Sequence, residues 1–331
     1  MLILGIESTA HTLGIGIVEK DSGMQILANA KDVYKPKHGW GIHPSEAADH
    51  HRIVAKEVLE KALSESDVSF DNIDAIAYSA GPGLPPCLKA GLEFAQQLSN
   101  KYGKLLLPVN HCIGHIEIGK LLSGARDPVT LYVSGGNTQV IAYAAKRYRV
   151  FGETQDISIG NAIDTFIRET QGDYPGGPVM ENLAKQGKNY IELSYVVKGM
   201  DLSFSGIMTS ALQKFKKGAS LNDLCFSFQE TCYAMLTEVT ERALAHTGKE
   251  EVLLTGGVAA SQRLNEMLEM MCNERGAKFY RCPKEFSGDN GAMIAVAGML
   301  AFASNQEGIK AEEADFKQRW RTDEADVAWL N

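Results

Sequence analysis

The sequence has few cysteines, no paired cysteine motif and no long apolar run, and each absence excludes a class of protein. Its six cysteines form no C-x-x-C pair and no zinc-finger spacing, so we expect buried free thiols rather than a disulfide framework. No stretch approaches the roughly 18 consecutive apolar residues of a membrane span, and residues 1–7 lack the basic region of a signal peptide. We therefore expect a soluble, cytoplasmic protein without a membrane partner.

Positive charge is also scarce. Lys and Arg number 33 against 41 Asp and Glu, which gives a formal net charge of −8. Such a chain does not attract nucleic acid by bulk charge, so a nucleic-acid partner would need a local basic patch or a helper subunit. Three small basic groups are candidates for phosphate contacts, or else solvated faces: Lys35, Lys37 and His38; Lys146, Arg147 and Arg149; Lys214, Lys216 and Lys217.

Short apolar runs alternate with segments of helical periodicity, which predicts an α/β architecture of about two domains in 331 residues. We predict strands over 2–7, 12–18, 74–79, 105–109, 129–133, 139–143 and 251–255. We predict helices over 45–64 with Ser45 as N-cap, from the 81–86 turn to about 100, and over 111–122, 161–171, 178–186, 205–217, 221–246, 261–275 and 289–304. The charged tail, 305–331, is expected to be peripheral.

A strand, a polar turn and a second strand occur twice, around residues 8–11 and again around 134–138. Two such units indicate two similar lobes that face one cleft. This is the layout of the actin, Hsp70 and sugar-kinase superfamily, so we expect a two-lobed, duplicated fold with a central nucleotide cleft. The predicted lobes are 1–112 and 113–295, with the C-terminal helix and tail, 296–331, as a candidate addition to the first.

Two histidines, His111 and His115, are spaced i, i+4 on a predicted helix, where both imidazoles point the same way and can share a metal ion. The alternative is a polar helix face. Tyr132, before the second turn, and Asp289, at a helix start, are candidate oxygen ligands. A zincin protease needs H-E-x-x-H, and Cys112 stands where its glutamate would be, which argues against a metalloprotease.

Several further residues are candidates for binding a nucleotide. The turn Ser134-Gly135-Gly136 can direct backbone N–H groups toward an anion, although a hairpin turn alone also favours these residues. Gly177 and Gly257 lie in Gly-Gly pairs where a flat ligand can approach the backbone. Asp164 and Glu181 can accept hydrogen bonds from ribose hydroxyls, or belong to solvated helix faces.

Together these motifs resemble one family, the universal tRNA threonylcarbamoyladenosine transferases, and specifically the archaeal catalytic subunit of the KEOPS complex, formerly called O-sialoglycoprotein endopeptidase. The resemblance covers about residues 1–300. It is carried, in order, by Glu7-Ser-Thr-Ala-His11, Gly81-Pro-Gly83, Asn110-His-Cys-Ile-Gly-His115, Tyr132-Val-Ser-Gly-Gly-Asn-Thr-Gln139, Asp164-Thr-Phe166, Gly176-Gly-Pro178, Thr255-Gly-Gly-Val-Ala-Ala260 and Asp289-Asn-Gly-Ala292.

The resemblance implies transfer of threonylcarbamoyl from threonylcarbamoyl-adenylate to N6 of adenosine 37, next to the anticodon, in tRNAs that read codons beginning with A. It implies an actin/Hsp70-like fold and one metal ion, Fe²⁺ or else Zn²⁺, on His111, His115, Tyr132 and Asp289. The adenylate would be bound by Tyr132, Val133, Ser134, Gly135, Gly136, Asp164, Gly177 and Glu181. Implied partners are tRNA, a small atypical protein kinase and two small KEOPS subunits. No kinase motif occurs in this chain.

The sequence departs from the family pattern at two positions. Ser261 stands where Asn is usual, and its hydroxyl lacks the paired donor and acceptor of an amide, so its part in holding adenine is in doubt. Pro85 replaces a common Gly, with an expected effect on loop stiffness alone. No single carboxylate or histidine stands out as the general base. The alternatives are an actin-like ATPase or kinase and a nucleotide-binding scaffold within the same complex.

Overall fold

The computed structural model describes residues 1–330 and contains two five-stranded sheets with the same strand order. In each, a three-stranded antiparallel meander is extended by two parallel strands on the side of its first strand. The first sheet runs β3 (Met24–Val33), β2 (Thr12–Lys20), β1 (Leu2–Glu7), β4 (Ala75–Gly81), β5 (Leu105–Asn110). The second runs β8 (Arg147–Glu153), β7 (Thr138–Ala144), β6 (Val129–Val133), β11 (Glu251–Thr255), β12 (Lys278–Arg281). This equivalence supports the predicted duplication.

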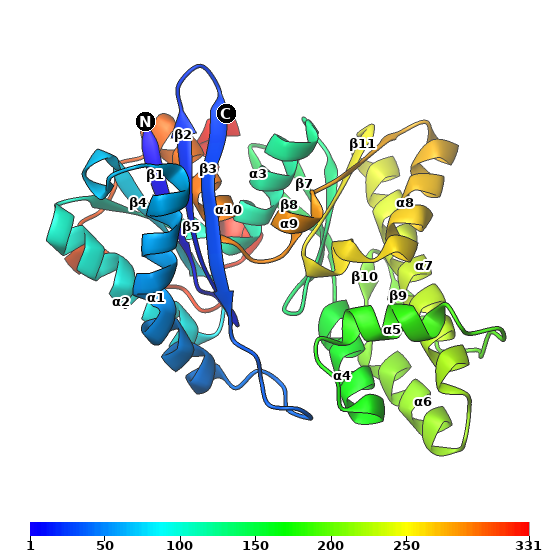
Figure 1. Ribbon diagram of the computed structural model, residues 1–331. Coiled ribbons are helices and arrows are strands. Elements are labelled where there is room, and N and C mark those ends of the chain that lie inside the picture. Colours follow the sequence, from blue (N-terminus) through cyan, green and yellow to red (C-terminus); the bar gives the residue numbers. More distant parts are fainter. Residues whose placement is uncertain (331) are drawn as a thin grey trace.

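Helices cover both sheets (Figure 1). Two of them pack beside the first sheet: α1 (Pro44–Ser66) and α2 (Pro85–Tyr102). The second sheet is accompanied by α4 (Ile159–Gln171), α5 (Gly176–Ala184), α6 (Ser205–Lys216), α7 (Leu221–Thr247) and α8 (Gln262–Arg275), with a small ladder of β9 (Val197–Lys198) and β10 (Asp201–Leu202). Within residues 1–330, every helix is too short or too polar to cross a bilayer.

The two remaining long helices, α3 (His111–Ser123) and α10 (Gly291–Ala303), each pack across to the other sheet. Helix α3 follows β5, yet a Cβ on its Gly119 would lie 3.0 Å from Leu253 Cδ2 of β11. Helix α10 follows β12 and the short α9 (Lys284–Ser287), yet a Cβ on Gly5 of β1 would lie 2.2 Å from the nitrogen of Ala295. Because these two helices also pack against each other at Gly114, their N-termini lie together between the sheets.

Most predicted elements are present, with several local differences. Strands β3, β8 and β12 were not predicted, and all three are edge strands with polar residues that mask the alternation. The two-residue strands β9 and β10 were also not predicted. Ser45 is not an N-cap: α1 begins at Pro44, whose ring fixes φ for the first helical position, and His43 is the N-cap. All six cysteines are free and buried, as predicted. The lobe boundaries at 112 and 295 stay a prediction.

The prediction of a peripheral tail is wrong. Residues 305–330, called the strap below, run across both sheets. Ile309 pairs with Leu106 of β5, Thr322 bonds Gln139 of β7, and Trp329 donates its indole N–H to Glu117 of α3. The strap is rich in charged residues, but the residues that it buries are small: Ala311, Ala314, Thr322, Ala325 and Val327.

Candidate functional site

The two candidate metal-ligating histidines lie in the first turns of α3. Asn110, the last residue of β5, is the N-cap, and its side chain accepts hydrogen bonds from the backbone N–H groups of Cys112 and Ile113. This fixes where the helix begins and therefore where His111 and His115 point. Their rings lie 4.8 Å apart between centroids, and both are buried.

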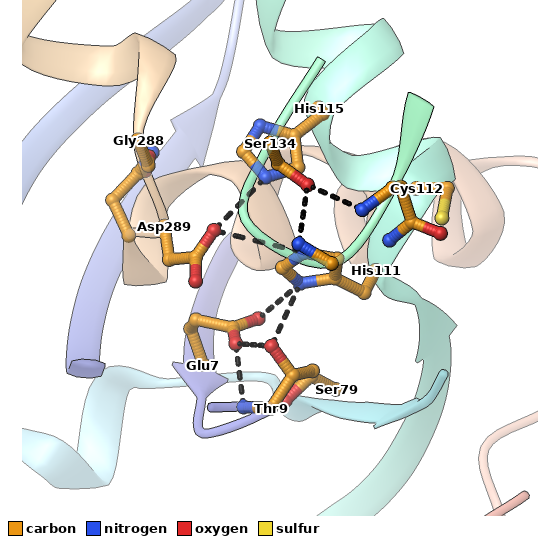
Figure 2. A network of polar contacts seen from close by, with 12 residues as sticks. Glu7, Thr9, Ser79, His111, Cys112, His115, Ser134, Gly288 and Asp289 are labelled. Atoms are coloured by element: carbon orange, nitrogen blue, oxygen red, sulfur yellow. Dashed lines mark hydrogen bonds and ion pairs between the residues drawn. The ribbon is translucent and has the colours of Figure 1, made fainter. Parts of the chain in front are cut away.

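Asp289 meets both histidines from the segment that precedes α10 (Figure 2). Its Oδ1 lies 3.2 Å from His115 Nε2 and 3.6 Å from His111 Nε2. Tyr132, at the second to last position of β6, places its hydroxyl 3.1 Å from His111 Nε2. The N-cap role at this helix belongs to the next residue, Asn290, whose side chain accepts from Met293 N–H. Asp289 is therefore free of capping and faces the imidazoles.

Glu7 and Thr9, at the first hairpin turn, hold His111 from the other side (Figure 2). Glu7 Oε2 lies 3.0 Å from His111 Nδ1, and Thr9 Oγ1 lies 3.2 Å from the same nitrogen. Thr9 also donates from both its N–H and its hydroxyl to Glu7 Oε1. Since Glu7 contacts Nδ1, the other ring nitrogen of His111, Nε2, is directed at the space between His115 and Asp289.

Burial and charge act on the pKa values of these groups in different directions. Burial works to lower the pKa of His111, but the Glu7 and Asp289 carboxylates outweigh it and raise that pKa to about 9. Burial lowers the pKa of His115, which is therefore neutral. For Asp289, burial is outweighed by the two histidines, and its pKa falls below its ordinary range. Burial raises the pKa of Tyr132 well above its ordinary value.

The donor set fits one transition-metal ion. The ligand atoms of His111, His115 and Asp289 all lie within 4.8 Å of one another. Ligand bonds of about 2.1 Å in a tetrahedral arrangement put neighbouring donor atoms about 3.4 Å apart. The observed separations are close to this: 3.1 Å from the Tyr132 hydroxyl to His111 Nε2, and 3.2 and 3.6 Å from Asp289 Oδ1 to His115 Nε2 and His111 Nε2. Imidazole with carboxylate and phenol oxygen suits iron or zinc. A resident ion would replace the proton that His111 carries without it.

The glycine turn after β6 lies beside this cluster. Ser134 Oγ accepts hydrogen bonds from the N–H groups of Gly136 and Asn137, and Ser158, the N-cap of α4, donates to the carbonyl of Gly135. Val133 is buried in the strand. Gly135 and Gly136 are exposed, and a Cβ on either would meet nothing within 4 Å, so the turn leaves open space above its backbone.

The other four nucleotide candidates lie on the second lobe's helices. Asp164 of α4 accepts the N–H of Gly176, and burial raises its pKa. Gly177 is exposed and open. Glu181 pairs with Lys185 at 3.2 Å and lines a cavity of about 390 Å³ between α5, α7 and α8.

Ser261 is the N-cap residue of α8 but makes no capping bond, and its buried Oγ has no hydrogen-bond partner within residues 1–330. Its hydroxyl lies near Tyr233, where it opposes the effect of burial, which raises the pKa of that phenol. Pro85 is simply the first residue of α2, a position that suits proline.

The four predicted metal ligands thus come together from α3, β6 and the start of α10. Glu7 was missed as a site residue, although the motif that contains it was noticed. A carboxylate at the end of a fully apolar strand is the signal that would have found it, because such a group needs a buried partner.

Known sequences similar to the chain carry names that refer to one tRNA modification. Residues 25–296 match the family model described as tRNA N6-adenosine threonylcarbamoyltransferase. A protein of that name from Thermococcus kodakarensis is 54% identical, over 99% of this chain and 100% of the relative. A "probable bifunctional tRNA threonylcarbamoyladenosine biosynthesis protein" from Methanosphaera stadtmanae is 51% identical, over 100% of this chain and 61% of the relative.

Solved structures with a similar fold are distant in sequence. HypF of T. kodakarensis gives a TM-score of 0.65 at 14% identity, over 94% of this chain and 49% of that one. The (R)-2-hydroxyglutaryl-CoA dehydratase component A of Acidaminococcus fermentans gives a TM-score of 0.55 at 12% identity. That match covers 89% of this chain and 96% of the solved one. These likenesses concern the fold alone, and they confirm the predicted actin/Hsp70-like architecture.

Proposed function

The chain belongs to the tRNA N6-adenosine threonylcarbamoyltransferase family, and on that premise we propose that it moves a threonylcarbamoyl group from threonylcarbamoyl-adenylate to N6 of adenosine 37 in tRNA. It is an acyltransferase. The observation that carries the proposal is the convergence of His111, His115 and Asp289 beside Tyr132 and the open turn at Gly135 and Gly136.

One metal ion, Fe²⁺ with Zn²⁺ as the alternative, would be held by His111, His115, Tyr132 and Asp289. Such an ion acts as a Lewis acid that polarises the carbamoyl or threonine oxygens. The chain's own part is to keep this site ordered: Glu7 and Thr9 fix the ring of His111, and Asn110 fixes the start of α3. Burial keeps His115 neutral, as a ligand must be.

The adenylate would lie along Tyr132, Val133 and the Ser134–Gly136 turn, with its phosphate against backbone N–H groups. The absence of a Cβ at Gly135 and Gly136 supports this, because the open space lets an anion approach the backbone. The ribose and adenine would extend toward Asp164, Gly177, Glu181 and Ser261. The hydroxyl of Ser261, which lies near Tyr233 and makes no capping bond to α8, can offer adenine a single hydrogen bond.

In the reaction, the adenosine amine forms a bond to the carbamoyl carbon, and the bond from that carbon to the phosphate oxygen breaks. AMP leaves with that electron pair, and the amine loses one proton. AMP is a good leaving group, so the main task of the protein is to position the two reactants and stabilise charge at the phosphate. The glycine turn would serve the second task if the N–H groups of Gly136 and Asn137, which donate to Ser134 Oγ in this structure, turned to the phosphate instead.

Partners are part of the proposal: a small atypical protein kinase and two small subunits. The net charge of −8 supports it, because an acidic chain gains from helpers that bring tRNA to it. The tRNA affinity of the chain should rise when the partners are added, and equal affinities would contradict this part.

The direct test combines the chain, its partners, threonylcarbamoyl-adenylate and unmodified tRNA, followed by nucleoside analysis. Modified adenosine should form, and its absence with correctly folded, metal-loaded protein would contradict the proposal. Transfer of a labelled γ-phosphate from ATP to an acceptor by this chain alone would favour the kinase alternative instead.

A further inference from the structure

The segment between β3 and α1, residues 34–43, is here called the arm. Its sequence, YKPKHGWGIH, contains two lysines and two histidines and no acidic residue, in a chain whose net charge is −8. In Figure 1 it is the blue loop that leaves β3 and extends toward α4. The arm contains the basic group formed by Lys35, Lys37 and His38, and of the three basic groups in the sequence it is the one with a tryptophan nearby, Trp40.

The arm bridges the two lobes at the edge of the candidate site. At its start, Tyr34 donates its N–H to the carbonyl of His11, in the turn that also contains Thr9. At its tip, Trp40 N–H closes a turn on the Lys37 carbonyl, and Gly39 N–H donates to the carbonyl of Gly172, the C-cap of α4. The tip is therefore pinned to the helix that carries Asp164.

Contacts with α4 are close enough to fix the arm's path. A Cβ on Gly172 would lie 2.7 Å from His38 Nε2, and a Cβ on Gly41 would lie 3.3 Å from a guanidinium nitrogen of Arg168. Arg168 thus adds a third cation, on α4, to Lys35 and Lys37 of the arm. Within the described part of the chain, none of these three cations forms a salt bridge.

Trp40 is exposed although the arm is held in place. Its side chain is 65% accessible, the second highest value among the large exposed apolar residues, and neither of the other two tryptophans is exposed. An exposed aromatic ring on the same segment as two exposed lysines matches the needs of single-stranded nucleic acid, where bases stack on aromatic rings and phosphates pair with Lys and Arg.

We propose that the arm is a binding surface for single-stranded RNA, in which Trp40 stacks on an unpaired base and Lys35, Lys37 and Arg168 contact the flanking phosphates. The inference rests on the proposed function, because the RNA loop it fits is the tRNA anticodon loop that contains the target adenosine. It assigns the tRNA contact to a specific surface, at the edge of the two lobes and adjoining both the first hairpin turn and Asp164.

The test measures direct binding, which is independent of catalysis. A fluorescent RNA stem-loop with the anticodon sequence is titrated with the full chain at low salt, and a stem of equal length without unpaired bases serves as the second probe. The chain should prefer the stem-loop. Trp40→Ala should weaken stem-loop binding about tenfold, Trp40→Phe should retain most of it, and the closed stem should bind equally to all three proteins.

Charge is tested with a matched pair. Lys35→Gln/Lys37→Gln should reduce the affinity for the stem-loop. The slope of log affinity against log salt concentration should also become shallower, by about one for each phosphate that no longer pairs with a lysine. Lys188→Gln/Lys198→Gln, at two exposed positions outside the three basic groups, removes the same charge elsewhere and should leave both unchanged.

Equal binding of stem-loop and closed stem, no effect of Trp40→Ala, or no binding by the unaltered chain would overturn the proposal. Failure of the proposed function is a separate result: the unaltered chain would then bind the stem-loop but form no modified adenosine with its partners and threonylcarbamoyl-adenylate.

Discussion

Glu7 Oε2 lies 3.0 Å from His111 Nδ1, and this contact joins the first strand of one sheet to the first residue of the helix that carries both candidate metal-ligating histidines. It sets which nitrogen of His111 holds a proton and which faces Asp289. A buried carboxylate in this position also stabilises the added positive charge of a bound cation.

Glu7→Gln should therefore weaken metal binding about 10- to 100-fold, the usual effect of removing a carboxylate behind a ligating histidine. The amide keeps the size of the side chain but removes its charge. Competition with a chelator of known affinity measures the change. Glu57→Gln, on the exposed face of α1, is the control and should bind metal as the unaltered chain does. Equal affinity in the Glu7 variant would show that this contact does not tune the site.

Acid should destabilise the protein through His51, a buried residue of α1 whose Nε2 lies 2.9 Å from the carbonyl oxygen of Ala10. Burial lowers the pKa of His51 to about 4. In the unfolded chain a histidine titrates near pH ~6.5, so the unfolded state takes up a proton first as the pH falls. The titration of His51 should therefore lower the unfolding free energy by about 2 kcal/mol when the pH falls from 7 to 5.

His51→Gln keeps a donor for Ala10 but does not titrate, so its unfolding free energy should fall less over the same pH interval. Urea unfolding at both pH values gives the comparison. His246→Gln, at an exposed position near the end of α7, should keep the acid sensitivity of the unaltered chain. An identical pH dependence in the His51 variant would rule out this assignment.

The strap should stabilise the fold through the buried carboxylate of Glu117. Glu117 Oε1 accepts hydrogen bonds from Tyr148 OH at 2.6 Å and from Trp329 Nε1 at 3.2 Å. Trp329→Phe removes one donor to a buried charge and should lower the unfolding free energy by about 1–3 kcal/mol. The same substitution at exposed Trp40 is the control and should change stability little. Equal stabilities of the two variants would mean that this end of the strap contributes little.

The contact of α10 with the first sheet should tolerate no added atom. A Cβ on Gly16 of β2 would lie 2.3 Å from the nitrogen of Ala292, and backbone cannot move away without separating helix and sheet. Gly16→Ala should destabilise the protein by about 3 kcal/mol or more. Gly23→Ala, in the open turn between β2 and β3, meets nothing within 4 Å and should be neutral in thermal unfolding. A stable Gly16 variant would contradict this packing.

Local patterns in the sequence predicted most of the fold, because buried strands and amphipathic helices leave short-range signals. These patterns did not predict the segments whose structure depends on tertiary contacts. Strand β8 begins with Arg147-Tyr-Arg149, which resembles a solvated basic group, yet Tyr148 is buried against the sheet. The strap is charged along its length, but its backbone pairs with β5, and no side-chain pattern encodes that pairing.

The side chains that converge at the candidate site were predictable from the sequence, but the residue that positions His111 was not. The spacing of His111 and His115 on one helix is visible in the sequence, and the family resemblance adds Tyr132 and Asp289. The contact between Glu7 and His111 spans more than a hundred residues. It depends on β1 and β5 flanking the same strand, β4, which only the sheet order reveals.

We propose above all that His111, His115, Tyr132 and Asp289 hold one metal ion that the transfer reaction needs. Metal analysis of the chain, purified without oxygen, should find one iron or zinc ion per molecule. His111→Ala/His115→Ala, checked for native circular dichroism, should retain less than about a tenth of the metal and of the modified adenosine formed with partners. A folded double variant with undiminished metal content or undiminished transfer would contradict the account.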